Sequence, residues 1–139
     1  MNRRSMRFSC VVIFLFLIAC AHPAASDQID KIRISYLGFV STIQRLVDRD
    51  QSSQDLPGSV LINRAMVKNQ QAREMLSTYH MDVQVVAGEG GKRLAVVLLC
   101  DERGNAIMEA VDCKLQPVFE EYGPGTPCRF TMDAKARCQ

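Results

Sequence analysis

Four cysteines in the C-terminal third of the chain are the residues best suited to chemistry: Cys100, Cys113, Cys128 and Cys138. Twelve, fourteen and nine residues separate them, whereas zinc ligands usually come in pairs about two to four residues apart. No Cys-x-x-Cys motif is present, so a thiol redox centre is not expected either. An even number of cysteines in a small exported domain instead predicts two disulfides.

The pairing of these cysteines is open, because four cysteines allow three connectivities. We favour Cys100–Cys113 with Cys128–Cys138, since short loops close at the smallest entropic cost. The alternative is Cys113–Cys128 with Cys100–Cys138. Each bridge is expected to contribute about 2–4 kcal/mol, mainly by restricting the unfolded chain.

Other candidate catalytic groups lack the partners that their chemistry needs. His80 is the one histidine beyond the N-terminal segment, and the sequence identifies no group that would orient it as a general base. Asp101 and Glu102 with Glu120 and Glu121 form two acidic pairs, but glycoside hydrolysis needs two carboxylates at a fixed separation across a cleft. No serine lies in a Gly-x-Ser-x-Gly motif. We therefore expect no catalytic residue, no metal site and no cofactor.

The first 26 residues have the composition of a secretory signal. Arg3, Arg4 and Arg7 precede an apolar run over residues 11–19. That run is too short to cross a bilayer, for which a helix needs about 20 apolar residues. A basic start, a short apolar run and a small-residue exit are typical of export signals. Export would place the later cysteines where disulfides persist.

The segment Leu17-Ile18-Ala19-Cys20 resembles the lipobox of bacterial lipoproteins. The resemblance implies cleavage before Cys20 and a lipid on its sulfur, and the alanine that follows implies the outer membrane. We favour this interpretation because the motif stands at the end of the apolar run. Ordinary signal-peptidase cleavage is the alternative, since Ala19-Cys20-Ala21 and Ala24-Ala25-Ser26 both have small residues at the required positions. A secreted eukaryotic protein is also compatible with such a signal.

Length and charge limit the domain number and the function of the rest of the chain. Residues 27–139 have the size of one domain with one core. Three of the arginines belong to the signal, so the 14 basic and 15 acidic residues that follow it give a net charge of −1. Nucleic-acid binding needs a concentrated positive field, and no run of like charge is present. We expect a single α+β domain over residues 27–139 that binds no nucleic acid.

Two helices are expected before His80. Apolar residues recur at alternating steps of three and four from Ile29 to Leu46, which predicts an amphipathic helix over about residues 27–50. A second apolar stripe, interrupted at Asn69, predicts a helix over about residues 59–79. The short connection between the two predicts an antiparallel helical hairpin.

Strands are expected after His80. The glycine-rich residues 88–92 separate a β-branched segment at 83–86 from an apolar run at 94–99. This pattern predicts a β-hairpin, not a phosphate-binding loop, because no helix follows the glycines. The run at 94–99 is apolar on both faces, so we expect a central strand with the helices on one side. Residues 106–112 suit a strand or a short helix, and the preceding tight turn favours the strand. A short last strand is expected at 128–132.

The expected fold is therefore α+β, with an N-terminal helical hairpin packed on a small antiparallel β-sheet and a disulfide-stapled C-terminal third. The expected function is a non-enzymatic binding or accessory module of the bacterial envelope, for example in secretion or conjugation machinery. Its partner would be an envelope protein or a cell-wall component. Its location would be the periplasm, at the outer membrane through lipid on Cys20, or outside the cell if secreted.

The expected binding surface combines the second helix with the loop at 88–93. Its residues are Met66, Asn69, Gln70, Arg73, Glu89, Lys92 and Arg93. Two other functions are alternatives. One is an immunity or inhibitor protein against a toxin or a cell-wall hydrolase, and the other is a small carboxylate-dependent hydrolase.

Overall fold

The computed structural model describes residues 23–114 and 116–139, so Cys20 and the predicted signal segment before residue 23 lie outside the described residues. The described residues belong to two units, residues 23–31 in the first and residues 32–139 in the second. In the first unit, Lys31 and Asp27 form an ion pair of 2.7 Å across one helical turn. Among the described residues, no helix has both the length and the apolar character that a membrane span requires.

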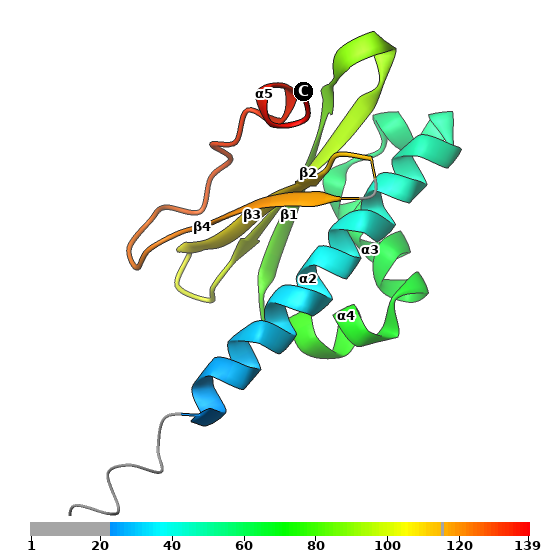
Figure 1. Cartoon of the computed structure of the whole chain (residues 1–139). Coiled ribbons are helices and arrows are strands. Elements are labelled where there is room, and N and C mark those ends of the chain that lie inside the picture. Colours follow the sequence, from blue (N-terminus) through cyan, green and yellow to red (C-terminus); the bar gives the residue numbers. More distant parts are fainter. Residues whose placement is uncertain (1–22, 115) are drawn as a thin grey trace, which may run out of the picture. The chain divides into compact units, whose positions relative to one another are not determined.

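Helices come first in the chain, as predicted. They are α2 (Pro23–Arg49), the short 3₁₀ helix η1 (Gln51–Asp55), α3 (Gly58–Lys68) and α4 (Gln70–Leu76). After α2 the chain turns back, so that α3 runs antiparallel to the part of α2 after residue 31 (Figure 1). Arg64 of α3 lies 3.8 Å from Asp50, the residue that follows α2.

The second predicted helix is not continuous. It breaks at Asn69, whose backbone angles (φ −132°, ψ 87°) are not helical. The Asn69 side chain accepts a hydrogen bond of 3.0 Å from the Ala72 amide and so caps α4. Asparagine favours such caps because its side chain competes with the helical backbone for hydrogen bonds. The prediction of one helix over residues 59–79 is therefore wrong at Asn69, and also at its end, where α4 stops at Leu76.

A four-stranded antiparallel sheet follows, with its strands side by side in chain order. The strands are β1 (His80–Ala87), β2 (Arg93–Cys100), β3 (Ala106–Asp112) and β4 (Pro117–Glu121). The glycine loop joins β1 to β2 as a hairpin, and residues 106–112 form a strand, as predicted. Gly90 and Gly91 have φ of 65° and 77°, a region that glycine enters without steric cost.

The last strand is not where the sequence placed it. The fourth strand is β4 at Pro117–Glu121, whereas residues 128–132 form no strand. The amides of Thr131 and Met132 donate to the carboxylate of Glu109, at 3.1 and 3.0 Å. These backbone groups are therefore satisfied by a side chain of the sheet, and no strand ladder forms. The tail ends in a short helix, α5 (Ala134–Arg137), which the sequence did not predict.

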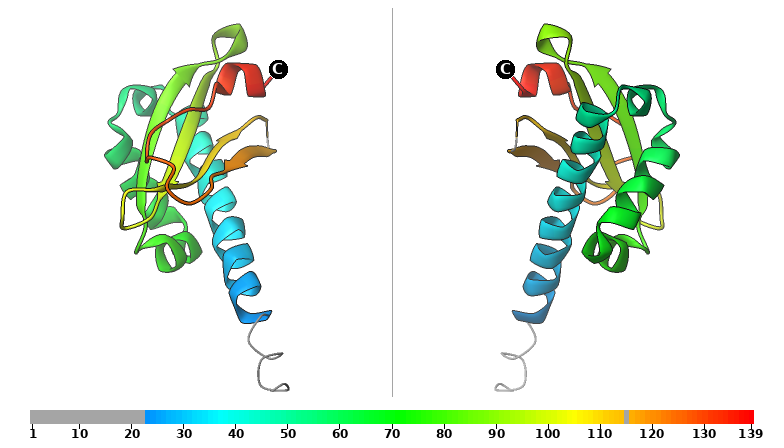
Figure 2. Two further views of the ribbon diagram at one scale, coloured as in Figure 1. Left: turned by 90° about the vertical axis from the view of Figure 1, so that its left-hand side faces the viewer. Right: turned by 90° about the vertical axis from the view of Figure 1, so that its right-hand side faces the viewer.

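The two faces of the sheet are covered differently (Figure 2). Ala95, Val97 and Leu99 of β2 pack in one large apolar cluster with α3, α4 and the part of α2 after residue 31. The alternate residues of β2 face the tail that follows β4, in two smaller clusters. The prediction of a central strand with the helices on one side is confirmed.

Two disulfides are present, as predicted, but neither of the two pairings considered from the sequence is correct. The bridges are Cys100–Cys128 and Cys113–Cys138, with Cα atoms 5.8 and 5.1 Å apart. The favoured pairing fails because β3 runs back along β2, which carries Cys113 to the opposite end of the hairpin from Cys100. A strand of seven residues spans roughly 23 Å, and a disulfide needs Cα atoms within about 7 Å. Both bridges instead join the sheet to the tail.

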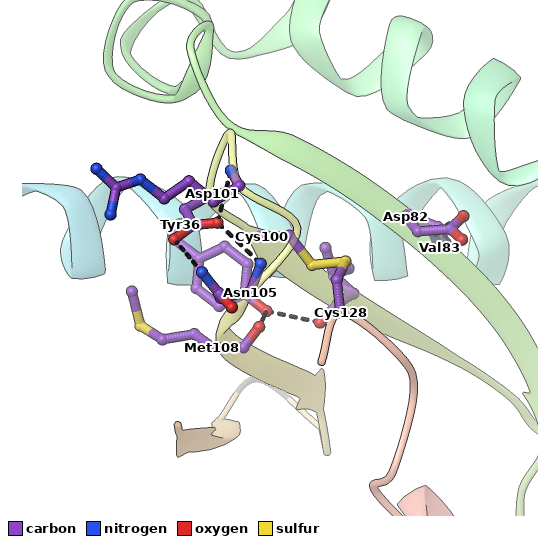
Figure 3. The surroundings of a disulfide bond; sticks show 10 residues. Tyr36, Asp82, Val83, Cys100, Asp101, Asn105, Met108 and Cys128 are labelled. Atoms are coloured by element: carbon purple, nitrogen blue, oxygen red, sulfur yellow. Dashed lines mark hydrogen bonds between the residues drawn. A yellow bond between two sulfur atoms is a disulfide. The ribbon is translucent and has the colours of Figure 1, made fainter. Parts of the chain in front are cut away.

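The first bridge adjoins a turn that the side chain of Asp101 organises (Figure 3). The Asp101 carboxylate accepts hydrogen bonds from the amides of Arg103 and Asn105, at 2.9 and 2.8 Å, and from the Asn105 side chain at 3.0 Å. These hydrogen bonds lower the pKa of Asp101, and the bond from the Asn105 side chain has the largest effect. The tail docks on the same turn, because the Cys128 amide donates to the carbonyl of Gly104. The turn thus holds Cys100 and Cys128 together.

Candidate functional site

A pocket of about 500 Å³ lies beside the end of β3. Its walls come from the C-terminal half of α2, from the loop between β1 and β2 with the start of β2, from the end of β3, and from the Cys113–Cys138 bridge. All of these segments belong to the unit formed by residues 32–139. Pockets of this volume are typical of sites for small ligands or single peptide groups.

The pocket exists because β2 extends further than β3. The β2–β3 pairing ends at Val96 and Val111, which leaves residues 93–95 without a partner strand on that side. The side chain of Gln44 takes the place of the strand: it accepts from the Ala95 amide at 2.8 Å and donates to the Arg93 carbonyl at 2.9 Å. Because a side chain is smaller than a strand, the remaining space is open, and α2 is fixed to the wall of the pocket.

Asp112 is the unusual residue of this pocket. It is the last residue of β3, it is 4% exposed, and its Oδ1 atom is buried without a hydrogen-bond partner. No hydrogen bond or ion pair to the Asp112 side chain occurs among residues 23–114 and 116–139. A buried polar atom without a hydrogen-bond partner costs about 1–3 kcal/mol, and such atoms in native proteins call for an explanation. A ligand that donates to Asp112 would supply one.

Charges of both signs surround Asp112. Lys92, Arg93 and Lys114 line the pocket together with Asp48 and Glu89. Arg93 also forms an ion pair of 3.5 Å with Asp55, which does not line the pocket. Asp48 accepts a hydrogen bond from the side chain of Gln44. Lys92 and Lys114 are exposed and form no ion pair in the described part of the chain. The pocket therefore offers the buried carboxylate of Asp112 and two exposed ammonium groups that have no ion pair within the described residues.

A second buried carboxylate shows what a satisfied group looks like in this protein. Glu109, in the middle of β3, has no exposed surface. Tyr122 donates to it at 2.6 Å, the Thr131 hydroxyl donates at 3.1 Å, and the two tail amides complete the set. Burial and the bond to Glu109 raise the pKa of Tyr122. Because donors within the fold satisfy both carboxylate oxygens of Glu109, this residue has a structural role. Asp112 has no such donors among the described residues.

The structure separates the residues of the predicted binding surface into two groups. Glu89, Lys92 and Arg93 line the pocket. The other four lie on or between α3 and α4 and do not line it: Met66, Asn69, Gln70 and Arg73. Of these, Asn69 caps α4, and Gln70 donates to Glu74 at 2.9 Å.

Three of the four acidic residues noted in the sequence are engaged elsewhere, and the fourth, Glu102, is exposed. Glu121 accepts from Arg33 at 2.6 Å and Glu120 forms an ion pair with Arg137, while Asp101 closes its turn. Within the described residues no group of three or more histidine, cysteine or acidic side chains is placed to hold a metal ion.

Sequence reasoning missed the two residues that define the pocket, Gln44 and Asp112. Gln44 stands within an amphipathic helix, where a polar residue is expected to be solvated. Asp112 had a weak local signal, because it follows Ala110 and Val111 and directly precedes Cys113. Asp112 pairs with Pro117 of β4, whereas the pairing with β2 has already ended at Val111, so its burial depends on the sheet and on the segments around the pocket.

Comparisons of the chain with protein-family models, with curated proteins and with solved structures found no match.

Proposed function

We propose that the protein is an exported, non-enzymatic binding module whose pocket recognises a group that carries both an ammonium and a carboxylate. The buried, unpartnered carboxylate of Asp112 carries this proposal. A ligand ammonium would donate hydrogen bonds to the Asp112 carboxylate, which has no partner in the fold. The ligand carboxylate would pair with Lys92 and Lys114, which also line the pocket. Amino acids, peptide ends and the peptides of a cell wall have this chemistry.

The size of the effect follows from the bond type. A hydrogen bond to a charged group contributes about 1.5–3 kcal/mol, which corresponds to roughly a 10- to 150-fold change in Kd. The change Asp112→Asn keeps the size of the side chain and removes no hydrogen bond of the described residues, so the variant should stay folded and should not be less stable than the parent.

The test uses titration of the mature protein followed by NMR chemical shifts. The probes are Nα-acetyl-lysine, with both charges, its methylamide, with the ammonium alone, and Nα,Nε-diacetyl-lysine, with the carboxylate alone. We expect Nα-acetyl-lysine to bind best. The Asp112→Asn variant should bind it at least tenfold more weakly, and the Tm of the variant should be unchanged or higher. The control is Asp82→Asn, the same change at an exposed residue of β1 outside the pocket. Equal binding of all three probes, or an Asp112→Asn variant that binds normally, would contradict the proposal.

The location is part of the proposal. The two disulfides support export, and the lipobox resemblance supports a periplasmic protein held at the outer membrane by lipid on Cys20. Its partner would then be an envelope protein or a cell-wall component. Mass spectrometry of the mature N-terminus tests this: we expect a lipidated Cys20, lost in Cys20→Ser. An unmodified N-terminus after residue 26 would show a secreted protein instead.

A further inference from the structure

The outward side of the helical hairpin carries four cations in two pairs. Arg45 and Arg49 are one turn apart on α2, and Arg64 and Lys68 are one turn apart on α3. They surround two hollows of about 170 and 350 Å³, which share Leu46, Arg49 and Lys68 as lining residues. We call this surface the cationic groove.

The groove has little acidic compensation. Among residues 23–114 and 116–139, no carboxylate lines the smaller hollow, and Asp50 is the one carboxylate that lines the larger, 3.8 Å from Arg64. Arg45 is held by the Ser41 carbonyl and the Thr42 hydroxyl, at 3.2 and 3.3 Å, which leaves its charge unneutralised.

Intramolecular forces account for only part of this arrangement. Like charges at i and i+4 destabilise a helix by about 0.2–0.5 kcal/mol per pair, and here two such pairs lie on adjacent helices. Arg49 and Lys68 stand in the last turns of α2 and α3, where cations favour the helix dipole. Arg45 and Arg64 lie one turn earlier, beyond most of that effect. The chain after the signal has a net charge of −1, so four cations in one groove are a local concentration of positive charge. An anionic partner would relieve the repulsion among them.

The shape of the groove indicates the class of anion. The Cβ atoms of residues one turn apart are separated by roughly 5–6 Å, and acidic side chains one turn apart on a facing helix have the same spacing. Apolar surface lies between the charges: Leu46 is half-buried, and Val67, which lines the larger hollow, is 80% exposed. A phosphate would engage the cations but leave Val67 in water, whereas an acidic amphipathic segment would cover both.

We infer that the cationic groove docks an acidic, amphipathic segment of a partner protein. This surface is separate from the pocket at Asp112. Gln44 and Asp48 of α2 line the pocket, whereas Arg45 and Arg49, the next residues along the helix, line the groove. The inference does not depend on the pocket having a ligand.

The test measures binding of a helical peptide of about twelve residues with Glu and Leu at alternating i, i+3 and i+4 positions, by fluorescence anisotropy. A matched peptide has Gln in place of Glu. We expect the variant Arg45→Gln/Arg49→Gln/Lys68→Gln to bind the Glu peptide at least tenfold more weakly than the parent. The control variant Arg103→Gln/Arg129→Gln/Lys135→Gln removes the same charge from exposed residues elsewhere and should retain binding. The affinity for the Glu peptide should also fall as salt is raised.

Other outcomes overturn the inference. An equal loss in both variants would mean that only net charge matters. Competition by inorganic phosphate at the peptide's own concentration would assign the groove to a phosphate ligand, and tighter binding to phosphatidylglycerol vesicles than to the peptide would assign it to a membrane surface. Loss of folding is excluded as a cause when the groove variant keeps its Tm, which we expect to stay level or rise as like-charge repulsion is removed.

Discussion

The two faces of the sheet are stabilised by different means. On the helix-covered face, a single cluster of fully buried apolar residues includes Phe39, Ile43 and Leu61. On the tail-covered face, the apolar clusters are small, and the covering segment after β4 contains only one short helix. Two disulfides and the hydrogen bonds of Glu109 supplement the burial there. A regular helix can cover a sheet by apolar contact alone, whereas an irregular tail needs cross-links and polar anchors.

The largest effect is expected on the helix-covered face. Phe39→Ala removes a side chain with no exposed surface and leaves a cavity, so it should lower the free energy of unfolding by about 3–5 kcal/mol. Urea unfolding followed by circular dichroism measures this. Ile34→Ala is the matched control on the same helix, since Ile34 is 65% exposed and its loss should cost little. A Phe39 variant as stable as the control would mean that this face is not the main core.

A smaller and more local effect is expected from the tail-covered face. The double change Cys113→Ala/Cys138→Ala opens a bridge with a sequence separation of 25 and should cost about 2–4 kcal/mol. The other bridge spans 28, so chain entropy predicts nearly the same cost for Cys100→Ala/Cys128→Ala. Hydrogen exchange should show protection lost first around α5 in the former variant, with α2 beyond residue 31 retained. Uniform loss across both faces would contradict the division between them.

The same division decides what the sequence could predict. Tyr36, Phe39 and Ile43 repeat at helical spacing, and this pattern depends only on neighbours in sequence. The helix-covered face and the order of helices before strands were therefore predictable. So was the presence of two disulfides, because it depends on cysteine number and compartment.

The tail-covered face depends on contacts that are distant in sequence. The amides of Thr131 and Met132 reach Glu109, more than twenty residues earlier, so the segment that looked like a strand is not one. The disulfide pairing depends on the direction of β3, which local spacing does not encode. The pocket, likewise, results from the different lengths of β2 and β3 and from Gln44, which lies 51 residues before Ala95. Site residues of this kind become visible only when the strands are paired.

The smallest expected change in stability tests the polar anchor of the tail. Glu109→Gln keeps the size of the side chain but replaces an acceptor oxygen with a donor that faces the donors of the tail. We expect the free energy of unfolding to fall by about 1–3 kcal/mol, with faster hydrogen exchange at Thr131 and Met132. Glu102→Gln is the control, because Glu102 is exposed in the turn between β2 and β3.

The titration of Tyr122 gives this experiment a second readout. Its pKa lies above the ordinary value of 10.0, through burial first and through Glu109 next. The folded state therefore favours the neutral hydroxyl; the stability this contributes is complete below pH 10 and is lost as the pH rises through the raised pKa. In Glu109→Gln, burial remains but the neighbouring charge is gone, so Tyr122 should ionise at a lower pH than in the parent. Absorbance of the tyrosinate near 295 nm, with Tyr122→Phe to assign the signal, measures the shift. An unchanged titration would mean that burial alone sets this pKa and that the tail is anchored by its disulfides without help from Glu109.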